Sequence, residues 1–257
     1  MKKLFVFAIA TMFAFSMSAQ KFGVKAGMNM SGYTTNFYTP DGSKMGMGFN
    51  AGLIGEMPVN DMMSLRADLT FSQLGSDFNS VDNTDEDWTM RAYGMEFSKT
   101  TNVNYLQLGI SPKFNFGPAY AFIGPYFGYA LSNTETGTWT VGDTEQTGVV
   151  DVFSAPTAWD ITKEYSDDNN LGGKDDLYNK IDFGFNLGLG ANFSGVFVEL
   201  NAGLGMMNFI NTESNLYNNK AIGGTEFYNM DKTGFETKAS QKNLFFGLSV
   251  GYMLGGE

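Results

Sequence analysis

The sequence predicts an all-β protein, an eight-stranded antiparallel transmembrane β-barrel with long extracellular loops and short periplasmic turns. Three observations predict this fold. Apolar residues recur with a period of two in eight segments, no later apolar run reaches the roughly 18 residues of a membrane helix, and short connections alternate with long ones. Strands, and not helices, are therefore expected to cross the membrane.

The first nineteen residues have the composition of a secretory signal peptide. Lys2 and Lys3 precede an apolar run from Leu4 to Phe15, and small residues lead to a cleavage point after Ala19. We therefore expect residues 1–19 to be removed on export. Residues 20–257 are expected to form a single outer-membrane β-barrel domain, a size that barrels commonly reach without dividing.

The first four predicted strands alternate apolar residues with glycine and polar residues. The apolar side chains stand at even positions in 22–30 and at odd positions in 48–57 and 63–72. The fourth segment, 105–116, keeps the pattern and contains Pro112. Because proline cannot donate a ladder hydrogen bond, we expect a bulge or a strand end there.

The last four predicted strands differ in how clearly their faces can be told apart. Segment 120–131 carries apolar or aromatic residues on both faces, so its faces stay unassigned. Segment 181–193 alternates most clearly, and 198–206 and 243–254 follow the same pattern. Each segment is close in length to the roughly nine to eleven residues that a tilted membrane strand needs.

The connections between these segments alternate in length. Short links lie around 59–61, 117–118 and 194–195. Outer-membrane barrels place short turns in the periplasm and long loops outside the cell. We therefore expect the chain in the bacterial outer membrane, with both ends of the barrel domain in the periplasm. The long connections are 31–46, 74–102, 132–180 and 209–240.

The polar face of the strands is expected to line the interior. It consists of Gly, Asn, Ser and a few charged residues, whereas a solvent-exposed face is usually rich in Lys and Glu. Small residues also allow a crowded eight-stranded interior to close. The apolar face would then contact outer-membrane lipid. A soluble periplasmic barrel, with its apolar face around a ligand, is the alternative.

Three basic and four acidic residues fall on the predicted interior face. Each needs a partner, because an unpaired charge away from water is costly. We expect a plug of mutually satisfied groups, with Glu56 and Arg66 meeting across the hairpin that turns at Asn60; an ion path is the alternative. The seven lumen residues are Lys25, Glu56, Arg66, Asp68, Lys113, Asp182 and Glu199.

Composition excludes several classes of function. The chain has no His and no Cys, which removes imidazole bases, thiol nucleophiles and the commonest metal ligands. The net charge of −11 argues against nucleic acid as a partner. The acidic stretch 82–87 lacks the spacing of an EF-hand loop. We therefore predict no catalytic residue, no cofactor, no metal site and no enzymatic activity.

The long connection 132–180 is the candidate binding surface. It contains Trp139, Trp159 and Tyr165, and long loops on a rigid scaffold tend to carry binding. We expect a small outer-membrane barrel with a polar, plugged lumen, whose loops bind an extracellular or envelope protein or organise the envelope. A small transporter or pore is the alternative, motivated by the charged interior.

Four stretches of the sequence carry a resemblance to a known family: KFGVKAGMN at 21–29, LRADLTFSQLG at 65–75, VNYLQL at 103–108 and DFGFNLGLG at 182–190. They resemble the outer-membrane β-barrel domain typified by PorT, which is common in Bacteroidota. The resemblance spans essentially the whole mature chain and implies the barrel fold. Some members of that family are linked to protein secretion, so a component of a secretion apparatus is a further alternative.

Overall fold

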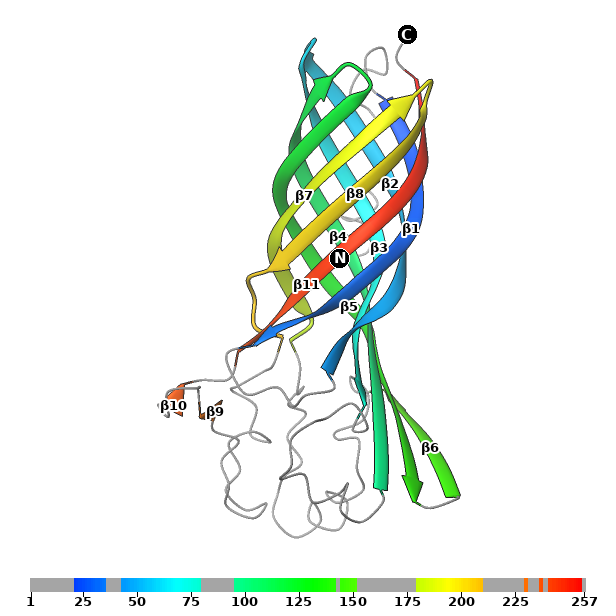
Figure 1. The fold of residues 1–257 in the computed structure, drawn as a ribbon. Coiled ribbons are helices and arrows are strands. Elements are labelled where there is room, and N and C mark those ends of the chain that lie inside the picture. The colour runs from blue at the N-terminus through cyan, green and yellow to red at the C-terminus, as the bar shows by residue number, and fades with distance from the viewer. Residues whose placement is uncertain are drawn as a thin grey trace, which may run out of the picture.

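The computed structural model is a closed barrel of eight antiparallel strands (Figure 1). The structure describes residues 21–35, 43–79, 95–141, 144–151, 179–209, 229–230, 236–237 and 240–255. The ring runs in the order β4-β3-β2-β1-β11-β8-β7-β5, and β5 pairs back with β4. Its strands are β1 Lys21–Thr35, β2 Ser43–Asn60, β3 Met63–Asn79, β4 Met95–Phe116, β5 Ala119–Val141, β7 Ile181–Phe193, β8 Val196–Gly205 and β11 Gln241–Leu254.

The eight predicted strands are therefore confirmed, and they lie in the predicted segments. The predicted signal peptide, residues 1–19, lies outside the described residues and stays a prediction. Within the described ranges, no helix is long and apolar enough to cross a membrane. Three short strands lie outside the ring: β6 Thr144–Asp151, β9 Asn229–Met230 and β10 Glu236–Thr237.

The two ends of the barrel differ as predicted. Strands β2 and β3, β4 and β5, and β7 and β8 are joined at one end by turns of two residues. Gly117 has a φ of 69°, and Ser194 and Gly195 have φ values of 52° and 93°, so the last turn has both central residues in the left-handed region that tight hairpins need. Strand β1 begins at this end and β11 finishes there, because Phe22 is paired with Leu254. We call it the short-turn end, and the opposite end the long-loop end.

Several strands are longer than predicted, and the largest extensions lie toward the long-loop end. Strand β3 continues to Asn79, β4 already begins at Met95, and β5 reaches Val141. Polar residues, many of them threonine and asparagine, fill these extensions, so the apolar period of two is absent there. The predicted long connections at 74–102 and 132–180 are thus strand over part of their length.

The bulge or strand end expected at Pro112 does not occur, but the pairing with β5 is interrupted there. Strand β4 continues to Phe116, and Pro112 stands opposite Leu65 in β3 without a change of register. Toward β5 the paired residues Gly109 and Lys113 keep one register, and the three residues between them, Pro112 included, have no register partner. The register shift between β4 and β5 lies elsewhere, between Asn104 and Tyr105, closer to the long-loop end.

Exposure of the side chains confirms the assignment of the two faces. Apolar side chains cover the outer wall: Leu187 is 50% exposed and Leu200 60% exposed. Polar side chains of the opposite parity point into the barrel and are buried. The unassigned strand β5 follows the same rule, since Phe122 and Tyr126 are buried inside while Ile123 is exposed outside. The apolar face therefore surrounds the barrel where lipid lies.

Aromatic rings fill the lumen by lying across glycines. Each of five inward aromatic residues has a glycine as its direct cross-strand partner, and a Cβ atom added to that glycine would collide with the ring. The glycines thus provide room for rings that a narrow eight-stranded barrel could not otherwise hold. The pairs are Tyr120 with Gly190, Phe122 with Gly188, Tyr126 with Gly184, Phe197 with Gly251, and Phe245 with Gly203.

Candidate functional site

All seven predicted lumen residues lie inside the barrel. Each is at most 8% exposed, and Glu199 is 0% exposed. The structure brings six of them together in the half of the lumen near the short turns, and Asp182 lies apart from them, toward the long loops. We call the six the ionic cluster: Lys25, Glu56, Arg66, Asp68, Lys113 and Glu199.

Arg66 is the centre of the ionic cluster. Its Nε and Nη2 atoms donate to the two carboxylate oxygens of Asp68 over 2.7 and 2.8 Å. Its Nη1 and Nη2 atoms donate to the two oxygens of Glu199 over 2.6 and 3.1 Å. Lys25 completes the group, with Nζ 2.9 Å from Asp68 and 3.6 Å from Glu199. The planar guanidinium is thus held by two carboxylates at once, which fixes its orientation.

The predicted meeting of Glu56 and Arg66 is wrong, although their Cα atoms are register partners. Glu56 accepts hydrogen bonds from Lys113 Nζ, at 2.7 and 2.9 Å, and Arg66 reaches across the lumen to Glu199 in β8. Two carboxylates offer Arg66 four oxygens for its fork of donors, more than Glu56 alone would supply. Cross-strand spacing along one hairpin gives no information about partners across a closed lumen.

Aromatic rings support the cations of the ionic cluster. Lys113 Nζ lies 4.1 Å from the centre of the Tyr120 ring, and the Arg66 guanidinium carbon lies 4.3 Å from that of Phe122. The Tyr120 hydroxyl donates to Glu199 over 2.9 Å. Three cations thus face three anions in the cluster, and the charge there is balanced. The balance and the hydrogen bonds offset the cost of removing these groups from water.

The other half of the lumen is filled by a cluster that sequence reasoning missed. Tyr33 from β1 stacks on one of its members, Phe209, with ring centres 5.3 Å apart. A usable signal existed, because Phe245 has the same parity as its inward neighbours Asn243 and Gly247. We call this group the apolar cluster: Leu74, Val103, Tyr105, Tyr126, Ala130, Phe209 and Phe245.

Asp182 lies against the apolar cluster without a basic partner. Its Oδ2 atom accepts hydrogen bonds from the Tyr126 hydroxyl at 2.8 Å and from Asn243 Nδ2 at 2.9 Å. Its Oδ1 atom has no hydrogen-bond partner, and no ion pair to it is found among the described residues. The plug predicted from the sequence therefore holds six of the seven charges in ion pairs and holds the seventh by neutral donors.

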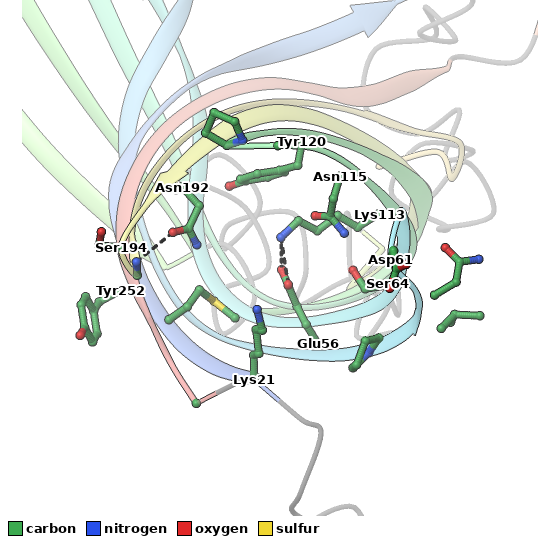
Figure 2. A pocket seen from close by; sticks show the side chains of 18 residues that line it. Lys21, Glu56, Asp61, Ser64, Lys113, Asn115, Tyr120, Asn192, Ser194 and Tyr252 are labelled. Carbon is green, nitrogen blue, oxygen red and sulfur yellow. Dashed lines mark hydrogen bonds and ion pairs between the residues drawn. The ribbon is translucent and has the colours of Figure 1, made fainter. Parts of the chain in front are cut away.

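The lumen holds little free space behind the ionic cluster. A cavity of about 20 Å³ lies between the two clusters, lined by Lys25 and Asp68 on one side and by Tyr126 and Phe245 on the other. That volume is close to what one water molecule needs. A larger cavity, of about 1090 Å³, opens at the short-turn end (Figure 2).

The candidate loop residues are only partly described. Trp139 lies in strand β5, where its Cα partners are Phe97 in β4 and Gln146 in β6, so it belongs to a sheet and not to an irregular loop. Trp159 and Tyr165 lie outside the described residues. The grouping of the three residues into one binding surface therefore stays a prediction.

A sheet projects from the barrel at the long-loop end (Figure 1). It consists of the ends of β4 and β5 together with β6, which pairs with β5 from Thr144 to Asp151. Strand β6 takes the side of β5 that β7 occupies within the barrel. Its other edge has no partner strand among the described residues. We call β6 and the paired ends of β4 and β5 the projecting sheet.

Comparison with known proteins gives a family. The model of the outer membrane protein beta-barrel domain matches residues 16–211. Among curated proteins, no relative is found. The Ail attachment invasion locus protein of Yersinia pestis is 11% identical over 93% of this chain and 100% of that chain, with a TM-score of 0.38.

Two further solved structures are similar at comparable levels. A major outer membrane protein from Thermus thermophilus is 15% identical over 92% of this chain and 100% of that chain, with a TM-score of 0.39. The outer membrane protease OmpT from Escherichia coli is 8% identical over 92% of this chain and 93% of that chain, with a TM-score of 0.33.

Proposed function

The chain belongs to the family of outer membrane proteins with a beta-barrel domain, and on that basis we propose that it presents a binding surface outside the cell on a barrel with a closed lumen. The partner is an extended polypeptide segment of an extracellular or envelope protein. The projecting sheet is the observation that carries this proposal. Binding of this kind needs no catalytic residue, in keeping with the absence of His and Cys from the 257 residues of the chain.

The length of the projecting sheet supports a role outside the membrane. Strands β4 and β5 have 22 and 23 residues, whereas β7 and β8 have 13 and 10. A tilted strand crosses the hydrocarbon layer with about nine to eleven residues. The extra ten residues of β5 from 132 to 141, at roughly 3.3 Å each, therefore extend well beyond the layer.

The edge of β6 that has no partner strand in the described part of the chain supports recognition by strand addition. An edge strand presents unpaired N–H and C=O groups, and an extended peptide can complete them as one more strand. Main-chain hydrogen bonds to β6 would supply the affinity. Trp139 lies in β5, the next strand of the same sheet. Edge strands that are left open are otherwise a risk for aggregation, so a free edge outside the membrane suits a docking role.

Phage-displayed random peptides selected against the protein in lipid nanodiscs test the proposal. An enriched peptide, made synthetically, should bind the intact protein and should protect amide protons of β6 from exchange. Two variants localise the site: one lacks residues 134–176, and the other has 144–151 replaced by eight Gly and Ser residues. Both should insert and lose binding. Undiminished binding by both variants would refute the assignment to the projecting sheet.

A small transporter or pore is the second candidate, motivated by the charged lumen. Planar-bilayer recording separates the two functions, because the packed ionic cluster leads us to expect no stable conductance steps. Steps in the intact protein that change with Arg66→Ala would favour the pore. Membership of the PorT type, and a place in a secretion apparatus, remain further alternatives; loss of secretion in a strain without the protein would favour them.

A further inference from the structure

The cavity at the short-turn end is a blind cup. It has a volume of about 1090 Å³, just above the roughly 300–1,000 Å³ typical of ligand pockets. Residues of all three short turns line its rim, and Glu56, Lys113 and Tyr120 lie at its floor (Figure 2). On the other side of the ionic cluster lies a cavity of only about 20 Å³. Among the described residues, the ionic cluster therefore closes the cup from behind.

The floor of the cup is already satisfied by its own groups. Lys113 donates to both carboxylate oxygens of Glu56, and its ammonium group rests on the Tyr120 ring. The Tyr120 hydroxyl is engaged by Glu199. A ligand in the cup would therefore find a neutral, rigid base, and its charged contacts must come from the wall and the rim.

Ser64 is a buried polar group of the cup without a partner. The residue is only 5% exposed, and its hydroxyl makes no hydrogen bond. Its two cross-strand neighbours explain this. Pro58 has no N–H to donate, and the ammonium group of Lys113 is committed to Glu56. A buried hydroxyl left unpaired is costly, and a ligand in the cup can supply the missing partner.

Two opposite charges of the cup are also unused. Lys21 extends into the mouth from the start of β1, and Asp61 lies in the turn between β2 and β3 (Figure 2). Neither side chain has a hydrogen bond or ion pair to any described residue. Among its other polar groups the cup thus presents an ammonium group and a carboxylate without partners and one buried, unpaired hydroxyl, around a floor whose own charges cancel.

We propose that the cup binds a short zwitterionic peptide. The ammonium group of Lys21 receives the peptide carboxylate, the carboxylate of Asp61 receives its amino group, and the Ser64 hydroxyl bonds to a peptide group between them. Neither charge of such a ligand would be left without a counter-charge. Because short turns lie in the periplasm in outer-membrane barrels, the peptide would come from the periplasmic side. This site is independent of the projecting sheet, which lies at the other end of the barrel.

Calorimetric titration of the full protein in nanodiscs tests this site with three probes: trialanine, N-acetyl-trialanine and trialanine amide. Trialanine should bind saturably with one site per barrel, and each capped form should bind about fivefold more weakly, as expected for the loss of one exposed ion pair. The three probes differ only in their end charges. They therefore separate charge recognition from general binding of peptide groups.

Single variants assign each contact. In Lys21→Met, trialanine and its amide should bind equally, because the partner of the carboxylate is gone. In Asp61→Asn, trialanine and its acetylated form should bind equally. Ser64→Ala should weaken all three probes by about two- to tenfold, the range of one neutral hydrogen bond. Lys242→Met, in β11 near the long-loop end, is the matched control and should leave binding unchanged.

Three results would overturn the proposal. These are the absence of saturable trialanine binding, equal binding of free and capped peptides, and a Lys21→Met variant that still prefers the free carboxylate. A heat-dependent shift in gel mobility shows that each variant is folded, and all three positions lie at or near the rim. If N-acetyl-trialanine binds as tightly as trialanine, the cup recognises an anion alone and the zwitterionic assignment fails.

Discussion

The two halves of the lumen fill the same narrow space by different means. Near the short turns, Arg66 and five other charged residues neutralise one another. Near the long loops, aromatic and aliphatic side chains pack together, and the single carboxylate of Asp182 is held by a tyrosine and an asparagine. Alternation inside a barrel thus specifies which side chains point inward, and does not require that all of them be polar.

The difference implies that the two halves respond differently when a charge is removed. A group in the ionic cluster has partners that become unpaired when it is lost, whereas Asp182 has only neutral neighbours that can find other arrangements. The same reasoning predicts that a charge introduced on the outer wall costs more than one introduced in the lumen, because lipid offers it no partner. Five substitutions, given in order of expected effect and accompanied by two control variants, test these differences. Each is measured by reversible urea unfolding in lipid vesicles, followed by tryptophan fluorescence.

Arg66→Met should have the largest effect. It leaves the carboxylates of Asp68 and Glu199 with only Lys25 as a cationic partner, at positions where both residues are buried. Removing one partner of a buried ion pair costs about 3–5 kcal/mol of unfolding free energy. A loss below about 1 kcal/mol would show that the ionic cluster is not the rigid plug of this half.

Leu187→Arg should follow, at a cost of about 2–4 kcal/mol if position 187 lies near the middle of the membrane. Its side chain points outward and is 50% exposed, so the new charge would face lipid. The matched control is Asn186→Asp, one residue earlier and facing the lumen, which should be better tolerated. Equal tolerance at the two positions would contradict the assignment of inside and outside.

Gly188→Ala and Gly184→Ala compare the two halves through the same kind of packing. The first glycine lies under Phe122 beside the ionic cluster, and the second under Tyr126 in the apolar cluster. An added methyl group would meet the Phe122 ring at Gly188, and at Gly184 it would meet both the Tyr126 ring and the backbone carbonyl oxygen of Leu204. Each substitution should therefore cost about 1–3 kcal/mol, the usual range for overpacking. We expect the larger loss at Gly184, because a backbone atom moves aside less easily than a ring. A larger loss at Gly188 would show that the support of Arg66 by Phe122 outweighs that difference.

Asp182→Asn should have the smallest effect, within about 1 kcal/mol of the parent protein. The amide oxygen can still accept from the Tyr126 hydroxyl, and no cation is left without a partner. Glu199→Gln is the control in the other half, where the lost charge is paired with Arg66, and it should cost several times as much. Equal losses for the two carboxylates would remove the distinction between the halves.

The fold and the inward direction of the charges could be predicted from the sequence, because a period of two is a local property. All seven lumen residues follow from their parity along single strands. Their partners do not, because Arg66 and Glu199 are separated by 133 positions and meet only when the ring closes. The Glu56–Arg66 prediction failed for this reason, since it used the one pairing that is visible along a hairpin.

The remaining differences also have physical causes. The extensions of β4 and β5 at the long-loop end carry polar residues on both faces, so no apolar alternation marks them as strands. The apolar cluster was missed because Phe245 stands between apolar neighbours of the opposite face. The cup could not be foreseen at all, since it depends on the residues of three separate turns meeting at one rim.

The pairing of β1 with β11 has a consequence for biogenesis. Fourteen register pairs, from Phe22 with Leu254 to Thr35 with Gln241, form this seam between the first and last strands of the ring. Until the final strand has arrived, β1 and β8 each keep an open row of backbone groups that lipid cannot satisfy. A polypeptide that ends before residue 241 therefore cannot insert stably in the bilayer. The unpaired edges of β1 and β8 would be open to periplasmic proteases. The seam makes completion of the ring the step that commits a molecule to the membrane.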